Sequence, residues 1–312
     1  MNNKNLDVVV VGELNIDLVL WNVPMPEDEK EKLAEDMRFT MGSSSAITAH
    51  NLSAIGSRVG FVGKAGKDAF GNYMKSELSA AGVDTSRIMQ EEDLKTGATI
   101  VLANPPKKAL LTYMGAMTDL TIEDMDWDYL KTAKHLHLGC FYLQTGIRDD
   151  VDRLFARAKE MGLTTSLDTN WDPDEKWDES IYNVLKQTDI FFPNDDEAIR
   201  IAHAGNLDEA VDKLAQMAGI VVVKRGKEGA LLKTGQSVLE QKPFNVNAVE
   251  TTGAGDSFNA GFLHQYLRDG DLKRSLRYGN ACGALAVTEM GGTAAFRNSP
   301  KMKKKMGNWL SE

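Results

Sequence analysis

The sequence is poor in the residues and segments on which several large classes of protein depend. Its 312 residues include two cysteines, Cys140 and Cys282, which cannot make a disulfide framework and lie in no C-x-x-C pair. No apolar run approaches the ~18 residues of a membrane span, and the N-terminal segment lacks the apolar core of a signal peptide. We therefore expect two inert buried thiols, no membrane partner and a cytoplasmic location.

Positive charge is scarce as well. The 36 basic residues are outnumbered by 45 acidic ones, which gives a net charge of -9 and makes nucleic acid an unexpected partner. The basic run from Lys301 to Lys305 is expected on the solvated face of a last helix that ends near Leu310. His135 and His137 alternate on one expected strand without further ligands nearby, so packing and hydrogen bonding are favoured over a metal site.

Short apolar runs alternate with amphipathic stretches along most of the chain, which predicts strand–helix–strand units on a parallel sheet. The runs lack polar alternation, as is typical of strands buried on both faces. The expected strands are Val8–Val11, Arg58–Val62, His135–Leu138, Thr164–Leu167, Ile190–Phe192 and Ile220–Val223. We expect a doubly wound α/β fold, a mostly parallel sheet with helices on both faces, in a single domain over residues 1–312.

Two stretches, about 15–40 and 95–114, interrupt this rhythm and are expected to form a small β lid inserted in the domain. In the second stretch, TGATIVLA and ALLTYMG flank a turn at NPPKK and predict a hairpin. A sheet this small can hardly bury its own apolar residues, so we expect a homodimer through the lid. The apolar residues concerned are Ile100, Val101, Leu110 and Leu111.

The segment Val249–Phe262, VETTGAGDSFNAGF, carries the most chemical information. Gly253, Ala254 and Gly255 allow a tight turn before an amphipathic helix. The free amides and the positive dipole end of that helix make an anion site suited to a phosphoryl group. Asp256 at this site could cap the helix or accept a proton from a substrate hydroxyl, and the residues alone leave both open.

This segment resembles the C-terminal signature of the ribokinase-like (PfkB) carbohydrate kinase family, D-T-x-G-A-G-D-x-F-x-A-G. Other segments match the family in order over nearly the whole chain: GELNID (12–17), MGSSSA (41–46), FVGKAGKDAFG (61–71), AAGVDTS (80–86), PNDDE (193–197) and KRGKEG (224–229). The resemblance implies a ribokinase-like fold and ATP-dependent phosphorylation of a hydroxyl on a sugar or sugar-like molecule.

The resemblance also implies the catalytic roles. Asp256 would take the proton from the attacking hydroxyl, while the amides of residues 253–256 hold the γ-phosphoryl group. Mg²⁺ would bridge the β and γ phosphates and be oriented, largely through water, by Asn194 and Glu197 of the N-x-x-E motif. Without the resemblance, Asn194 and Glu197 would be interpreted as a capping box at a helix start.

The nucleotide is expected against the KRGKEG segment, at Lys224, Gly226 and Gly229, although G-x-x-G after a strand is often only a turn. Asn280, in a helix expected over 272–289, matches a family position near the adenine. The alternative is that Asn280 is a solvent-facing polar residue of that helix.

The sugar is expected near Asn15 and Asp17, which lie two residues apart at the end of the first expected strand and therefore point to one side. Their amide and carboxylate could hold vicinal hydroxyls. Gly42 and Ser43 match a Gly-rich turn that contacts the sugar in the family, although the serines could simply cap the next helix.

Three departures from the family bear on specificity. Met41 and Ala46 replace a glycine and a sugar-binding asparagine, which argues against ribose. Asp172 stands where many sugar-acid and phosphosugar kinases have arginine, which favours a neutral monosaccharide. Glu250 replaces an aspartate that, with the backbone of Thr252 and a turn here near Gly291, lines a potassium site in cation-activated members, so a need for K⁺ stays open.

Two alternative functions are retained. A nucleoside kinase of the same fold is the nearer one, and acceptance of a nucleoside would distinguish it. A catalytically idle sugar or nucleotide sensor belongs to a different class. The intact G-A-G-D run argues against a sensor, because a sensor needs no base at the phosphoryl site.

Overall fold

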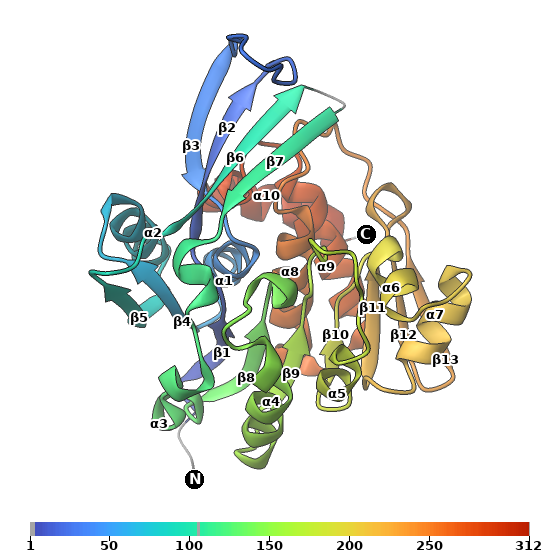
Figure 1. Cartoon of the computed structure of the whole chain (residues 1–312). Coiled ribbons are helices and arrows are strands. Elements are labelled where there is room, and N and C mark those ends of the chain that lie inside the picture. Colours follow the sequence, from blue (N-terminus) through green and yellow to red (C-terminus); the bar gives the residue numbers. More distant parts are fainter. Residues whose placement is uncertain (1–3, 105–106, 312) are drawn as a thin grey trace.

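The computed structural model describes residues 4–104 and 107–311, which form a large sheet flanked by helices and a separate small sheet (Figure 1). The strands of the large sheet are β1 (Leu6–Val11), β4 (Val59–Gly66), β5 (Asp84–Glu91), β8 (Ala133–Leu138), β9 (Thr164–Leu167), β10 (Ile190–Phe191), β11 (Ile220–Lys224), β12 (Ala230–Thr234) and β13 (Ser237–Gln241). Their order is β13-β12-β11-β10-β9-β8-β1-β4-β5. The pairs from β11 to β5 are parallel, and β12 and β13 add an antiparallel edge.

Helices cover both faces of this sheet. On one face lie α1 (Ser44–Ala54), α2 (Ala69–Ala80), α8 (Ala254–Asp269) and α9 (Leu272–Ala286), with α10 (Ser299–Leu310) packed outside α9. On the other face lie α3 (Trp127–Leu130), α4 (Val151–Glu160), α5 (Ile181–Leu185), α6 (Asp195–Ile201) and α7 (Leu207–Leu214). The predicted doubly wound α/β fold is therefore confirmed. No helix within the described residues is long and apolar enough to cross a bilayer.

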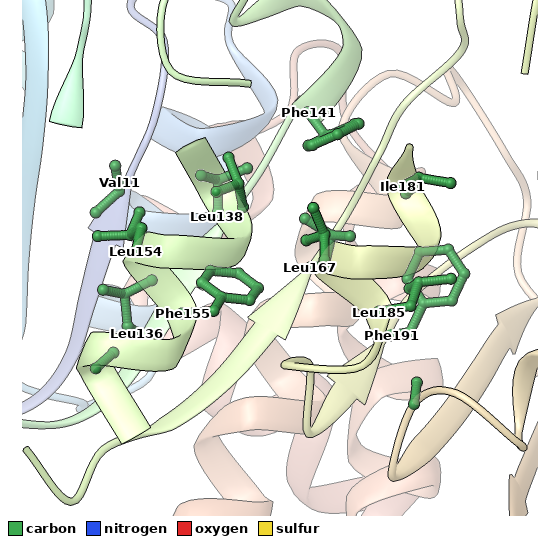
Figure 2. Close-up of a cluster of buried hydrophobic side chains, with 14 of the residues drawn as sticks. Val11, Leu136, Leu138, Phe141, Leu154, Phe155, Leu167, Ile181, Leu185 and Phe191 are labelled. Atoms are coloured by element: carbon green, nitrogen blue, oxygen red, sulfur yellow. The ribbon is translucent and has the colours of Figure 1, made fainter. Parts of the chain in front are cut away.

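The valine run of β1 explains why the sheet needs helices on both sides. Successive side chains of a strand point to opposite faces, so Val8 and Val10 join one core while Val9 and Val11 join the other. Figure 2 shows the second core, in which Phe155 of α4 packs among the sheet residues. All six predicted strands lie in the large sheet, although Arg58 falls just before β4 and Phe192 just beyond the end of β10.

The small sheet, called the lid here, contains β2 (Asn15–Trp21), β3 (Asp36–Met41), β6 (Gly97–Asn104) and β7 (Lys107–Tyr113) in the order β3-β2-β6-β7. It rises away from one end of the large sheet (Figure 1). The predicted hairpin is confirmed by the antiparallel register of β6 and β7, and part of its NPPKK turn, residues 105–106, lies outside the described residues. Asn15 and Asp17 begin β2 of the lid, so the prediction that they end the first strand is wrong.

Candidate active site

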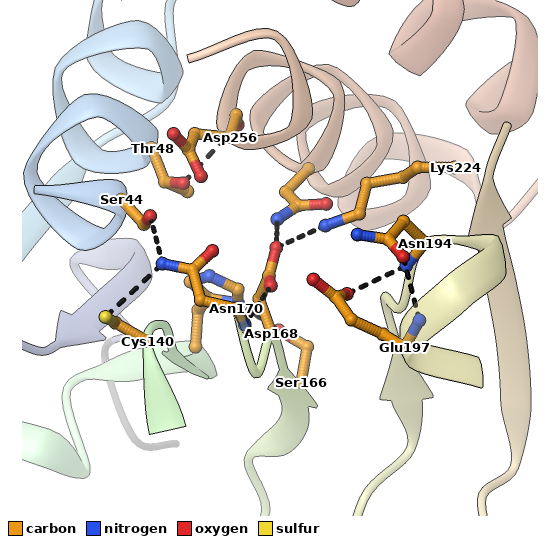
Figure 3. Close-up of polar contacts among 12 residues, drawn as sticks. Ser44, Thr48, Cys140, Ser166, Asp168, Asn170, Asn194, Glu197, Lys224 and Asp256 are labelled. Atoms are coloured by element: carbon orange, nitrogen blue, oxygen red, sulfur yellow. Dashed lines mark hydrogen bonds and ion pairs between the residues drawn. The ribbon is translucent and has the colours of Figure 1, made fainter. Parts of the chain in front are cut away.

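Polar residues follow the carboxyl ends of several neighbouring parallel strands. Glu13 follows β1, Cys140 follows β8, Asp168 follows β9 and Asn194 follows β10, while Lys224 is the last residue of β11. Carboxyl ends of parallel strands share one edge of a sheet, where open α/β folds bind their ligands. Figure 3 shows residues of these strand ends meeting the first turn of α8.

Two cavities lie at this edge. The lid cavity, of about 610 Å³, lies between the lid and the strand ends and includes Asn15, Asp17, Asn170 and Asp256 in its lining. The α8–α9 cavity, of about 550 Å³, lies beside β11 against helices α8 and α9. Both have the volume of small-molecule sites. Lys224, Gly226, Thr251 and Gly255 line both cavities, so the two meet at the N-terminus of α8.

A glycine is required where α8 begins. Gly253 is the N-cap residue with φ +74°, and a Cβ there would lie 2.5 Å from the Cα of Gly292. No side chain caps this helix; the amide of Ala254 donates to the carbonyl of Thr251 at 3.3 Å, and the other amides of the first turn stay available to a ligand. Asp256 lies within the first turn rather than at the cap, which removes the capping alternative considered for it.

Asp256 is an unusual carboxyl group because it is 9% exposed and lines the lid cavity. Burial, together with the negative charge of Asp168, raises its pKa to about 8, although Lys224 opposes the shift. Thr48 of α1 donates a hydrogen bond to its backbone carbonyl at 3.3 Å (Figure 3). The arrangement holds a weakly acidic carboxyl group at the floor of the cavity.

A buried ion pair lies beside it that the sequence did not reveal. Lys224 Nζ donates to Asp168 Oδ2 at 2.5 Å, and the side-chain amide of Asn259 donates to the same oxygen. Burial disfavours the Asp168 carboxylate, but Lys224 together with the hydrogen bonds from Asn259 and Asn170 outweighs this and lowers the pKa of Asp168. The only signals in the sequence were an aspartate directly after a buried strand and an asparagine one helical turn after Asp256.

Asn194 and Glu197 form the capping box that their spacing indicated. Asn194 Oδ1 accepts the amide of Glu197, and Glu197 Oε2 accepts the amide of Asn194, each at 2.9 Å. Both residues also line the lid cavity, and burial raises the pKa of Glu197. The cap uses one lone pair of the single side-chain oxygen of Asn194 and one of the two carboxylate oxygens of Glu197, so a structural role and a ligand role are compatible at this helix start.

On the lid side of the cavity, Asn15 Nδ2 donates to Asp17 Oδ1 at 3.1 Å and lies 3.3 Å from Thr99 Oγ1. Burial and the nearby Glu250 raise the pKa of Asp17 to about 7. Gly42 has no room for a side chain, because a Cβ would lie 2.1 Å from Asp17 Oδ1. Ser43 caps α1 through Ala46, so its hydroxyl is partly committed to the fold.

Three residues of the lid cavity that are not glycine have left-handed backbones: Ser43 (φ +67°), Cys140 (φ +55°) and Asn170 (φ +54°). Such strain costs about 1–3 kcal/mol per residue and gathers at functional sites. Asn170 Nδ2 donates to Ser44 Oγ at 2.6 Å and to Cys140 Sγ at 3.3 Å, which links three segments around the cavity (Figure 3). Sequence reasoning missed Glu13, Cys140 and Asn170 as lining residues.

The α8–α9 cavity has a glycine turn on one wall and apolar residues on the other. Gly229, with φ +93°, approaches the carbonyl oxygen of Gln241 so closely that a Cβ would lie 2.0 Å from it. Asn280 is 8% exposed and donates to the carbonyls of Gln241 and Lys242, so the solvent-facing alternative for it is wrong. Phe244 and Val287 supply part of the apolar lining.

Glu250 brings together the residues considered for a monovalent cation. Its Oε2 accepts the amide of Gly291 at 2.8 Å and its Oε1 accepts the amide of Thr252 at 3.2 Å. Among the described residues, no cluster of three His, Cys, Asp or Glu side chains could hold a metal ion.

Two other sequence predictions are resolved here. Asp172 lines neither cavity; its carboxylate accepts the amides of Trp177 at 2.8 Å and Asp174 at 3.0 Å, so the expectation that it faces a substrate is wrong. His135 and His137 are buried and hydrogen-bonded to Ser166 of β9, as predicted. Both cysteines are buried free thiols.

Comparisons with known proteins agree with this geometry. The sequence model described as pfkB family carbohydrate kinase matches residues 5–298. An ATP-dependent ribose-1-phosphate kinase from Halopiger xanaduensis is 32% identical over 293 residues, which cover 92% of this chain and 94% of that protein. A 5-dehydro-2-deoxygluconokinase from Clostridium botulinum is 27% identical over 306 residues, with coverages of 91% and 88%.

Solved structures share the fold at lower identity. Arabidopsis thaliana ribokinase complexed with ribose and ATP has a TM-score of 0.84 at 23% identity and covers 96% of this chain and 98% of its own. Fructokinase with bound ATP from Xylella fastidiosa has a TM-score of 0.84 at 22% identity, with coverages of 98% and 99%. The chain belongs to the pfkB family of carbohydrate kinases and is an ATP-dependent sugar kinase with the ribokinase-like fold.

Proposed function

We propose that the lid cavity binds a sugar, that the α8–α9 cavity binds ATP, and that phosphoryl transfer takes place where they meet. The observation that carries this assignment is the position of Asp256 and Gly255: Asp256 lines the lid cavity, while Gly255 lines both cavities. A kinase must bring an acceptor hydroxyl and a γ-phosphoryl group together in line, with water excluded.

In this proposal Asp256 is the general base. Its carboxylate accepts the proton of the acceptor hydroxyl as the hydroxyl oxygen forms a bond to the γ phosphorus. The bond from the γ phosphorus to the β–γ bridging oxygen breaks at the same step, and ADP leaves. The amides at the start of α8, from Gly253 through Ala254 and Gly255, stabilise the charge on the transferred group, because no side chain caps them.

Magnesium fits the donor set near the lid cavity. Asn194 and Glu197 offer amide and carboxylate oxygens, and the lack of a three-carboxylate cluster among the described residues suits an ion that keeps several waters. When bound with ATP, Mg²⁺ neutralises charge on the β and γ phosphates. We assign Asn194 and Glu197 to orient it through water.

For the nucleotide, we assign the phosphates to Lys224, Gly226 and Gly229 and the adenine to the apolar wall near Asn280. The ammonium group of Lys224 lies where the cavities meet, and the glycines allow backbone amides to approach the phosphates closely. Phe244 and Val287 offer apolar contact for a planar base.

For the acceptor, we propose a neutral monosaccharide whose hydroxyls are held by Asn15 and Asp17. Both side chains line the lid cavity, and Gly42 keeps the space beside Asp17 open. Ser43 completes this corner through its backbone, since its hydroxyl caps α1. Asp172, now placed outside the cavity, no longer supports this choice of substrate.

One observation favours a second class of acceptor, a sugar carrying a phosphate or carboxylate. Lys108 of β7 lines the lid cavity, and its positive charge opposes the rise in the pKa of Asp17, so its ammonium group faces the same space. The ribose-1-phosphate kinase named above has a phosphosugar acceptor in its name. Lys108→Met would raise KM for an anionic acceptor and leave KM for a neutral sugar unchanged.

The test is ADP release from Mg-ATP with a panel of hexoses, pentoses, sugar acids, phosphosugars and nucleosides, and with Asp256→Asn as the control. Turnover with one sugar class that Asp256→Asn abolishes would support both the acceptor and the base assignment. Turnover with nucleosides alone would indicate a nucleoside kinase. ATP binding without turnover on any acceptor would favour a sensor, and turnover that survives in Asp256→Asn would overturn the base assignment.

We also propose that potassium stimulates the enzyme. Glu250 holds Thr252 and Gly291 together beside the start of α8, so an ion bound to backbone carbonyls there would act on the amides of that helix. Replacing K⁺ by tetramethylammonium at constant ionic strength is expected to lower kcat, and equal rates in both salts would overturn this proposal.

We propose that the chain is a single domain with an inserted lid. We also propose that two copies form a homodimer through the lid, and the exposed residues of the lid support this. In the β6–β7 hairpin, Ile100 pairs with Leu111 and Val101 pairs with Leu110, so the four predicted residues do not share one face. Val101 is 4% exposed and, with Leu110, lines the lid cavity, which corrects its assignment to the interface. We propose that Ile100 and Leu111, on the opposite face, contact a second copy of the chain.

A further inference from the structure

Asp168 is a fully buried carboxylate at the active edge of the sheet to which the proposed mechanism gives no role. It is 1% exposed and directly follows β9. Its Oδ2 accepts hydrogen bonds from Lys224 and Asn259, and its Oδ1 accepts the amide of Asn170 at 3.2 Å. Figure 3 shows it between Asp256 on one side and Glu197 on the other.

Lys224, the ion-pair partner of Asp168, lies where the two cavities meet. The Lys224 side chain is 14% exposed and lines both cavities, and a Cβ on Gly255 would lie 3.5 Å from its Nζ. A lysine side chain has four rotatable bonds, so an untethered ammonium group would sample many positions in a space this large. The contact with Asp168 selects one of them, beside the first turn of α8.

Asp168 is itself held from two sides. Asn259 lies three residues after Asp256 on α8, so its hydrogen bond connects the carboxylate to the helix that carries the base. The amide of Asn170 fixes the other oxygen from the loop after β9. The carboxylate therefore joins three parts of the site: β9, the end of β11 and the first turns of α8.

We propose that Asp168, oriented by Asn259, is a positioning residue that holds the Lys224 ammonium group where the two cavities meet. In that position the ammonium group contacts the phosphoryl group in transfer. This inference rests on the proposed function for the identity of the transferred group. Asp168 does not touch either substrate in this scheme and acts through Lys224.

A double-mutant cycle tests the inference, using Asp168→Asn, Lys224→Met and the double variant. We expect Asp168→Asn to lower kcat about 100-fold, as is typical when a catalytic group is displaced by about 1 Å, and to raise KM for ATP. KM for the acceptor should change little. If Asp168 acts through Lys224, the double variant will be no slower than Lys224→Met alone.

Asp168 and Lys224 shift the pKa of Asp256 in opposite directions, so the variants differ in the pH at which Asp256 ionises. Their kcat values should therefore be compared on the high-pH plateau of the pH–rate profile, where Asp256 is ionised in every variant. Asp172→Asn is the matched control, because Asp172 is also buried on the β9 loop but lines neither cavity. It should lower Tm without changing kcat or KM for ATP. Multiplicative losses in the double variant, or wild-type kinetics in folded Asp168→Asn, would overturn the proposal.

Binding of a non-hydrolysable ATP analogue, measured by calorimetry, separates this inference from the proposed function. A weaker affinity in Asp168→Asn than in Asp172→Asn supports the positioning role even if the acceptor panel gives no turnover, and equal affinities contradict it. If Asp168→Asn does not fold, the comparison passes to the double variant and Lys224→Met, both of which lack the buried ammonium group. Equal analogue affinity and kcat in those two support the proposal, and a further loss in the double variant contradicts it.

Discussion

At the scale of single residues, burial gives Asp256 a pKa suited to a general base but also destabilises the folded protein when the carboxyl group is ionised. A general base works best when its pKa is close to the working pH, and a carboxyl group reaches that range only when it is taken out of water. Burial does this for Asp256, aided by the charge of Asp168, and Glu13 adds to the effect while Lys224 opposes it. The same burial makes the ionised form costly to the fold.

The first prediction concerns the pH dependence of the rate. The raised pKa of Asp256, about 8, means that the carboxyl group is mostly protonated at pH 7 and cannot accept a proton. We expect kcat/KM to rise about tenfold per pH unit up to pH 7 and to level off above pH 8. ADP release at low acceptor concentration from pH 5 to 10 measures it, and a rate already constant from pH 6 upward would contradict the assignment.

The second prediction concerns the stability of Asp256→Asn. Between the ordinary value of 3.8 and about 8, the unfolded chain ionises this carboxyl while the folded protein keeps it protonated, so the free energy of unfolding falls as pH rises through that window. An asparagine carries no such cost. We expect the variant to lose turnover by about 10²-fold or more and yet to unfold at a Tm higher by a few degrees at pH 8.

Differential scanning calorimetry at pH 4 and pH 8 checks this sign. The advantage of Asp256→Asn over the wild type should be small at pH 4 and larger at pH 8. A variant that is destabilised equally at both values would mean that the carboxyl group is held by contacts which an amide cannot replace.

At the scale of elements, the sequence was informative where a pattern is local. The valine run of β1 predicted a strand, because burial on both faces leaves an apolar run without polar alternation in the sequence. The capping box at Asn194 was likewise visible as a three-residue spacing.

The parts of the site that were missed depend on distant pairs. Asp168 meets Lys224 and Asn259, which are 56 and 91 residues away, and no local spacing marks such contacts. Asp172 was misassigned because the chain turns at Asn170, whose φ is +54°, so that the carboxylate binds amides of its own loop. A motif gives the position of a residue along the chain, whereas the turn decides which way its side chain points.

A third prediction tests the core behind the site. Leu154 of α4 is fully buried against Leu136 and Leu138 (Figure 2), so Leu154→Ala should lower the free energy of unfolding by about 2–5 kcal/mol. The neighbouring Arg153 is exposed, and Arg153→Ala should cost about 1 kcal/mol or less. Urea denaturation measures both, and similar losses in the two variants would contradict this packing.

At the scale of the whole molecule, the fold explains why two substrates can meet at one point. The parallel strands bring their carboxyl ends to one edge, α8 points its N-terminus at that edge, and the lid closes the space on the acceptor side. The lid is a sheet of four strands, with one face on the cavity and the other face apolar and exposed at Ile100 and Leu111. Cover over this apolar outer face would add to the stability of the lid.

The last prediction compares the same substitution at two adjacent leucines of β7, one of which serves as the control for the other. Leu110 and Leu111 are each 56% exposed but point to opposite faces, Leu110 into the lid cavity and Leu111 away from it. If a second copy of the chain covers the outer face, Leu111→Lys places an ammonium group in that interface and should sediment as a 34.3 kDa monomer. Leu110→Lys should remain dimeric and change KM for the acceptor. A wild-type protein that is monomeric at micromolar concentration would contradict the dimer. If both substitutions dissociate the dimer alike, lysine anywhere in the hairpin disturbs the lid. That result would contradict the assignment of the outer face as the dimer interface.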